Sequence, residues 1–114
     1  MIDHPVLSDD QRTPPKTVAE ATRKGRDLRE HHGRGGAEVG VRRAEQLVER
    51  ELVSDRDTQS MYSDFARHAV DKRTRHWGDT DKPSTGYIAW MLWGGDDARD
   101  WIEGPRPTLR EVGV

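Results

Sequence analysis

The sequence predicts an all-α protein, a small single-domain bundle of about five helices, and two observations lead to this. Apolar residues recur three or four positions apart in several stretches, as on one face of a helix, and no stretch alternates as a half-buried strand does. Residues that cap or stop helices stand between these stretches. The length of 114 residues suits one domain. We expect a flexible arm at 1–12, the helical domain at 13–104 and a tail at 105–114.

The first helix is expected to follow Thr13, which can act as its cap, with Pro14 at the first helical position. One face then carries Val18, Ala21, Gly25, Leu28 and His32. A glycine within such a face predicts that another helix approaches closely at Gly25. Gly33 is expected to end this helix.

Two further helices are expected between residues 37 and 70. The second covers about 37–51 and carries along one stripe Val41, Ala44, Leu47 and Val48. Ser54 can cap the third, at about 55–70. Its helically spaced residues are Thr58, Met61, Tyr62, Phe65 and Ala69. Residues 71–83 are charged, lack a period and are expected to form a loop.

The fourth helix, about 85–93, is apolar nearly all round, which predicts that it is the central, buried helix. Ser84 or Thr85 can cap it, and Gly94-Gly95 should end it with at least one positive φ. Asp96 is expected to cap a fifth, short helix. The expected core cluster is Trp90, Trp93 and Trp101, with Trp93 largely buried; the alternative is an exposed aromatic patch that docks a partner protein.

Composition narrows the function classes. The absence of cysteine excludes disulfides and thiolate zinc sites. The first residues show no signal-peptide pattern, and the longest apolar run, at 88–93, is far shorter than the roughly 20 residues that cross a bilayer. We expect a cytoplasmic protein without membrane contact, cofactor or catalysis. The histidines show no compact metal-ligand spacing, and the serines lack a nucleophile pattern.

Basic residues concentrate in the central segment, 12–76, between acidic flanks. Lysine and arginine neutralise phosphates, and a neighbouring aromatic ring can stack on a base. The candidate nucleic-acid contacts are Arg34, Arg42, Arg43, Arg67, Lys72, Arg73, Arg75 and Trp77. The alternative is that acids such as Glu45 and Asp64 pair with these cations. Residues 33–36, before a helix, likewise fit either an anion site or a tight turn.

Three stretches are distinctive together. They are Gly33-Arg34-Gly35-Gly36; Phe65-Ala66-Arg67-His68; and Pro83-Ser84-Thr85-Gly86-Tyr87-Ile88-Ala89-Trp90 running into Leu92-Trp93-Gly94-Gly95-Asp96. With them the chain resembles, over roughly residues 14–101, a small uncharacterised domain that recurs in bacteriophage and prophage proteins. The resemblance implies a helical fold, a phage origin and residence in the host cytoplasm or association with the virion. It implies no catalytic residues.

Two functions follow as expectations. The first is a non-catalytic phage accessory protein that contacts nucleic acid through the basic segment between Arg34 and Arg75. The second is a protein-binding module that acts in phage assembly or on a host protein. Its signature would be an exposed apolar patch around Tyr87, Met91 or the tail residues Leu109 and Val112.

Overall fold

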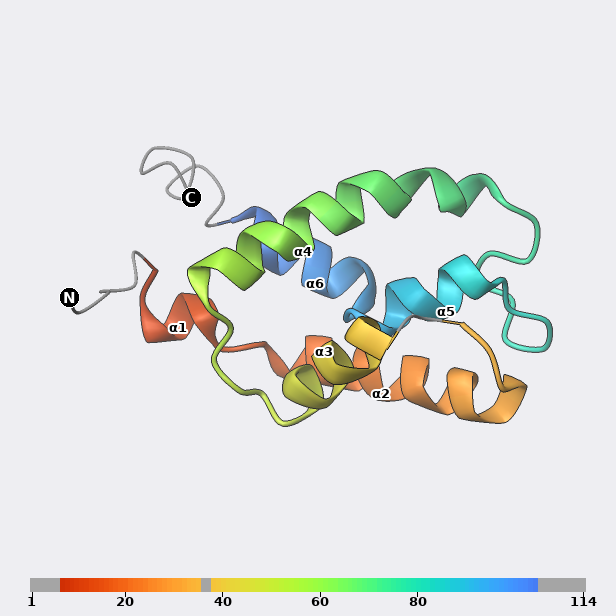
Figure 1. The fold of residues 1–114 in the computed structure, drawn as a ribbon, viewed down its shortest axis with the longest axis horizontal. Helices are drawn as coiled ribbons and strands as arrows, with labels where there is room; N and C mark the ends of the chain where they lie inside the picture. The colour runs from red at the N-terminus through yellow and green to blue at the C-terminus, as the bar shows by residue number, and fades with distance from the viewer. Residues whose placement is uncertain (1–6, 36–37, 105–114) are drawn as a thin grey trace.

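The computed structural model describes residues 7–35 and 38–104, and all regular elements within these residues are helices (Figure 1). The elements are α1 (Asp9–Arg12), α2 (Lys16–His32), α3 (Glu38–Val48), α4 (Asp55–His68), the 3₁₀-helix η1 (Ala69–Arg73), α5 (Thr85–Leu92) and α6 (Gly95–Glu103). Five α-helices of eight residues or more therefore form this part of the chain, and the all-α prediction is confirmed. The expected tail at 105–114 lies outside the described residues.

Helix α5 is the central element, as predicted. It begins after Ser84, whose hydroxyl oxygen accepts the Tyr87 N–H at 3.1 Å, and it buries Tyr87, Ile88, Trp90 and Leu92. Figure 1 shows α5 and α6 between the long helices α2 and α4. Because its neighbours cover α5 on several sides, an almost wholly apolar helix is stable there.

Helices α2 and α5 approach each other closely at Gly25, as the sequence predicts. A Cβ atom on this residue would lie 2.6 Å from both the backbone N of Leu92 and the backbone C of Met91. Both atoms belong to the backbone of α5, which cannot rotate away as a side chain can. Only glycine therefore allows α2 and α5 to pack at this distance.

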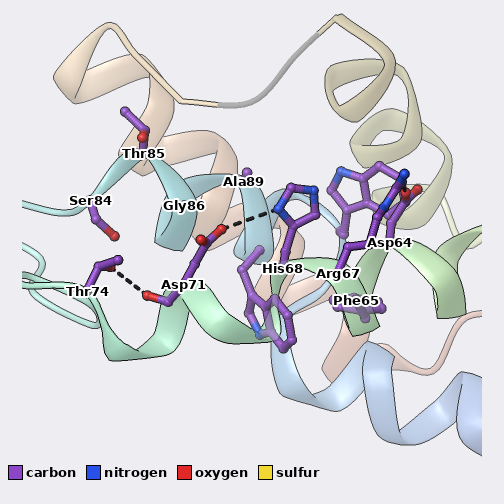
Figure 2. Close-up of a pocket in the computed structure, with 12 residues that line it drawn as sticks. Asp64, Phe65, Arg67, His68, Asp71, Thr74, Ser84, Thr85, Gly86 and Ala89 are labelled. Atoms are coloured by element: carbon purple, nitrogen blue, oxygen red, sulfur yellow. Dashed lines mark hydrogen bonds and ion pairs between the residues drawn. The ribbon is translucent and has the colours of Figure 1, made fainter.

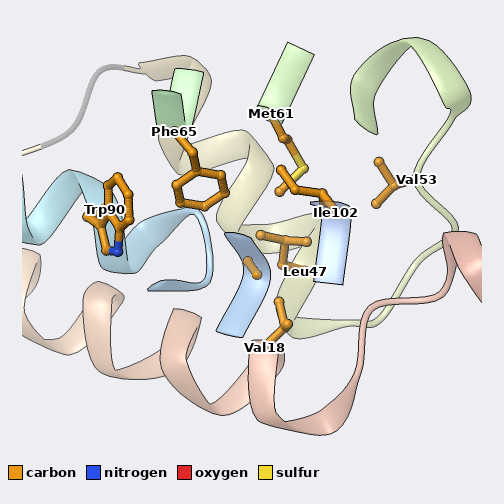
Figure 3. Packing of buried hydrophobic residues seen from close by; sticks show 8 residues of the cluster. Val18, Leu47, Val53, Met61, Phe65, Trp90 and Ile102 are labelled. Atoms are coloured by element: carbon orange, nitrogen blue, oxygen red, sulfur yellow. The ribbon is translucent and has the colours of Figure 1, made fainter. Parts of the chain in front are cut away.

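The core consists of two clusters of buried residues. The first cluster joins α2, α3, α4, α5 and α6 (Figure 3), and its members are Val18, Leu47, Val53, Met61, Phe65, Trp90, Ala98 and Ile102. The second lies around the other side of α5 and consists of Leu28, Ala44, Tyr87, Ile88 and Leu92. Trp77 and Trp93 pack against both clusters, which links them into one interior.

The turn between α5 and α6 confirms one prediction and corrects another. Both glycines have positive φ, 98° at Gly94 and 66° at Gly95. Asp96 does not cap α6, because Gly94 occupies the cap position and Asp96 lies within the first turn. Its carboxylate instead accepts hydrogen bonds from the side chains of Lys72 and Trp90. Trp93 and Trp101 are partly buried and pack against the first core cluster, which agrees with the predicted core position of Trp93.

The described part of the segment expected to be a flexible arm, residues 7–12, packs against the domain, and residues 1–6 lie outside the described residues. Leu7 is 3% exposed, and Ser8 forms a reciprocal capping box with Gln11 at the start of α1. The arm is attached to the domain because the Arg12 carbonyl accepts the Val53 N–H at 2.8 Å. Single-turn helices give no apolar period, which explains why the sequence did not predict α1.

Two other boundaries differ from expectation. The residue before α2 is Pro15, not Thr13. Thr13 instead follows the last residue of α1, and its hydroxyl donates to the carbonyl of Asp9 in that helix. The loop expected from residue 71 onward starts with η1, which continues α4 in a tighter helix and contains Asp71 and Lys72. Gly33, with φ 63°, ends α2 as predicted.

Candidate functional site

A half-open pocket lies between α4, η1 and α5 and has a volume of about 700 Å³. Figure 2 shows its lining, which comes from the end of α4, from η1 and the residue that follows it, and from α5 with the residues at its two ends. The lining residues are Asp64, Phe65, Arg67, His68, Asp71, Thr74, Ser84, Thr85, Gly86, Ala89, Trp90 and Trp93. This volume lies within the roughly 300–1,000 Å³ typical of ligand pockets.

The apolar part of the pocket is built from three aromatic rings. The Phe65 ring lies edge-to-face with Trp90, with centroids 4.7 Å apart, and with Trp93, at 6.3 Å. Phe65 comes from α4, while the tryptophans are three residues apart at the end of α5. The rings therefore fix the spacing between α4 and α5 and form an aromatic wall with Ala89.

The other end of the pocket is polar, and Asp71 is its central group. The Asp71 carboxylate lies against the first turn of α5: a Cβ on Gly86 would be 3.1 Å from its Oδ2. A carboxylate is stabilised beside the N-terminus of a helix, where backbone N–H groups lack helical partners. Glycine at position 86 leaves the room for this approach. The Thr74 hydroxyl also donates to the Asp71 carbonyl and holds the end of η1 in place.

The α4 side of the pocket carries two pairs of charged or ionisable residues. Arg67 bonds to Asp64, and His68 Nδ1 lies 3.3 Å from Asp71 Oδ2. In both pairs the basic side chain is the more exposed: 71% for Arg67 and 60% for His68. The acids therefore lie deeper in the pocket than their partners.

The hydroxyl, imidazole and carboxylate groups of the pocket do not form a hydrolytic relay. In such a relay the imidazole lies between the hydroxyl and the carboxylate. Here Asp71 lies between Ser84 and His68 in Figure 2. The Ser84 oxygen accepts the Tyr87 N–H as a helix cap. In this pocket Ser84 therefore serves as a helix cap, and His68 faces Asp71 rather than Ser84.

Three of the predicted nucleic-acid contacts have acidic partners within the chain. Arg43 Nη1 lies 3.2 Å from Asp57, Arg67 pairs with Asp64, and Lys72 Nζ lies 2.7 Å from Asp96. These contacts match the alternative of internal pairing. Asp64 is one of the acids named for it, whereas Asp57 and Asp96 come from helices that the sequence did not connect with these cations.

The other predicted contacts have different surroundings. Arg34 donates to the Pro83 carbonyl at 2.9 Å, and Trp77 is partly buried against Tyr87 and Trp90. Arg42, Arg73 and Arg75 are exposed, and within the described residues they have no ion pair or hydrogen bond. The structure thus leaves three of the seven predicted cations without a partner among the described residues.

Asp96 connects η1 to α5 and α6. It accepts from Lys72 Nζ at 2.7 Å and from Trp90 Nε1 at 2.8 Å. Burial acts to raise the pKa of Asp96, but the hydrogen bonds from Lys72 and Trp90 together outweigh it, so the net shift is downward. Through these two hydrogen bonds Asp96 holds η1, which forms the polar end of the pocket, against Trp90 of the aromatic wall.

Sequence reasoning did not find the pocket, although one signal of it was present. Gly86, Ala89 and Trp93 are spaced along one side of α5, so two small residues precede a large one there. Small residues on a helix that is otherwise bulky and apolar leave a volume that its neighbours must fill or leave open. The sequence could not show that α4 and η1 leave it open.

Comparison with protein-family models, curated proteins and solved structures found no match. Within residues 7–35 and 38–104, no helix combines the length and apolar character needed to cross a membrane. In the same residues, no three histidine or acidic side chains gather as metal ligands.

Proposed function

We propose that this protein is a non-catalytic module that binds a partner protein by accepting one of its side chains in the pocket between α4 and α5. The observation that carries the proposal is the pocket itself, with about 700 Å³ of space, an aromatic wall and a polar rim. Protein interfaces concentrate their binding energy where one side chain fills a largely dry pocket surrounded by polar groups. Phe65, Trp90 and Trp93 supply the first part of that arrangement, and the residues around Asp71 supply the second.

The surface proposed to bind the partner protein is a cavity and not the exposed apolar patch that the sequence predicts. Tyr87 is buried and Met91 partly buried, so these residues do not form an exposed patch. Leu52 and Val70 are exposed large apolar side chains, and the pocket offers further accessible apolar surface inside a cavity. A cavity of this kind selects a protruding side chain rather than a flat surface.

A displayed library of random peptides, selected against the wild-type protein, tests the proposal. Ala89→Phe places a ring inside the pocket, and Ala66→Phe adds the same ring to an exposed position on α4 outside it. We expect the selected peptides to bind the Ala66→Phe variant as they bind wild type, and to lose binding to Ala89→Phe. Circular dichroism would first establish that both variants are folded. Selection of no peptides, or equal binding to both variants, would contradict the proposal.

Nucleic-acid contact is the second candidate, supported by Arg42, Arg73 and Arg75. Each neutralised phosphate releases counterions, so such binding weakens steeply with salt. Fluorescence anisotropy with mixed-sequence DNA should then show that replacing Arg73 and Arg75 by glutamine flattens the salt slope by roughly two units, about one for each lost contact. Absence of binding at low salt would rule this candidate out. The phage origin, and a role in phage assembly or on a host protein, rest on the sequence resemblance alone.

A further inference from the structure

We infer that the side chain accepted by the pocket is cationic, a lysine presented by the partner protein. The inference rests on the proposed function and adds the chemistry of the bound group. It follows from three features of the lining: the aromatic rings, the partners of the carboxylates, and the separation of the apolar from the acidic end.

The tryptophan rings of the pocket already attract cations from this chain. Lys72 Nζ lies 4.9 Å from the centroid of the Trp90 ring, and the Arg43 guanidinium carbon lies 6.0 Å from that of Trp93. The face of an aromatic ring carries partial negative charge and favours a nearby cation. Trp90 is only 3% exposed, so an ammonium group entering the pocket would reach chiefly the ring of Trp93, which is partly exposed.

The carboxylates of the lining favour a cation over an anion. Asp64 is neutralised by Arg67, whereas Asp71 faces His68, which is charged only when protonated. Lys72 and Arg43, the cations nearest the rings, each have an acid of their own in Asp96 and Asp57. Among the acidic and permanently cationic residues of the lining, two carboxylates, Asp64 and Asp71, therefore face one cation, Arg67. An anionic guest would be repelled by Asp71.

The two ends of the pocket match the two parts of a lysine side chain. Phe65, Ala89 and Trp93 offer apolar surface, and Asp71 lies toward the α5 N-terminus (Figure 2). Lysine has a four-carbon apolar stem that ends in a compact ammonium group, so it covers apolar surface while its charge reaches a polar group. A purely aliphatic side chain would fill the first part and leave Asp71 without a partner cation.

Three short peptides test this inference: acetyl-Ala-Lys-Ala-amide, its norleucine counterpart, which keeps the stem but lacks the charge, and its glutamate counterpart. Binding to the wild-type protein would be followed by ¹H–¹⁵N NMR shifts at Asp71, Gly86 and the tryptophan indoles. We expect the lysine peptide to bind roughly tenfold more tightly than the norleucine peptide, as a partly desolvated cation over aromatic rings predicts. The glutamate peptide should bind most weakly.

Matched variants identify the groups responsible. Asp71→Asn should reduce lysine binding, leaving only the part of the preference that the rings supply, and should leave norleucine binding unchanged. Asp27→Asn, on the exposed side of α2, should change neither. Because Asp71 also lies against the first turn of α5, its replacement can disturb the local structure. A second readout therefore uses the wild-type sequence with fluorinated tryptophan, which weakens the attraction of the rings for cations. It should lower the affinity for lysine and not that for norleucine.

The outcomes separate this inference from the proposed function. Tightest binding by norleucine, with shifts at the pocket, would overturn the lysine assignment and leave the protein-binding pocket standing. Tightest binding by glutamate would overturn it in favour of an acidic partner segment. Absence of shifts with all three peptides overturns the inference, and the library selection then decides whether the pocket binds protein at all.

Discussion

Asp96 shows how one side chain can join three elements. It was expected to cap α6, a local role, but its hydrogen bonds reach Lys72 in η1 and Trp90 in α5. Lys72 also lies over the ring of Trp90. The three groups therefore form a closed set in which each contacts the other two, and changing one of them alters the surroundings of both others.

The lowered pKa of Asp96 predicts a pH dependence of stability. A carboxylate with a lowered folded-state pKa contributes stability above its unfolded pKa, about 3.9, and loses that contribution as pH falls through the folded value. Asp96→Asn should therefore reduce stability at pH 7 by roughly 0.5–1 kcal/mol, the scale of a solvent-screened pair, and by less near pH 3. Urea unfolding at the two pH values measures this.

The control for Asp96 is its neighbour Asp97, which lies in the same first turn of α6 and is exposed. Asp97→Asn removes the same charge from the same helix end without removing contacts to Lys72 or Trp90. If the two variants lose equal stability at pH 7, the helix dipole accounts for the effect, and the contacts of Asp96 with Lys72 and Trp90 do not.

At the scale of elements, the contact between α2 and α5 depends on Gly25. Gly25→Ala should cost about 3 kcal/mol or more, because the added methyl group meets backbone atoms and forces the helices apart. Gly33→Ala is the matched control: a Cβ there meets nothing within 4 Å, so only its φ of 63° is unfavourable, at about 1 kcal/mol. Chemical denaturation gives both values. A larger loss at Gly33 would show that the packing argument is wrong.

Most helices could be predicted from sequence because their signals are local. The local signals are capping by Ser54 and Ser84, termination at Gly33, the apolar periods of α2 to α4 and the almost wholly apolar composition of α5. Elements that lack a period were missed. Helix α1 is one turn long, and η1 is charged and follows α4 without a break, so neither produces a repeating pattern.

The candidate site could be predicted only in its parts. The aromatic residues were assigned to the core, and Phe65 and Trp90 are buried there. That these rings also form a pocket wall depends on the distance between α4 and α5, which no local pattern sets. The predicted basic surface did not take account of ion pairs such as that between Lys72 and Asp96. These residues are 24 positions apart and become neighbours only in the folded chain.

At the scale of the whole molecule, the two core clusters should unfold together, because Trp77 and Trp93 pack against both. We expect the far-UV circular dichroism and tryptophan fluorescence of the wild type to change in one coincident transition. Leu47→Ala, at a fully buried position, should lower stability by about 3 kcal/mol and shift both signals equally. Leu52→Ala, at a position that is 45% exposed, should change it by less than about 0.5 kcal/mol. Separate transitions would mean that the clusters are independent.

The first described helix and the last lie against each other. The Trp101 indole donates to the Gln11 carbonyl at 3.0 Å, and Figure 1 places α1 and the end of α6 at one extreme of the molecule, with η1 and the start of α5 at the other. Anything tethered before α1 or after α6 is therefore anchored on the side remote from the pocket. A surface or a fluorophore attached at either point would therefore lie at the opposite end of the molecule from η1 and the start of α5, which line the polar end of the pocket.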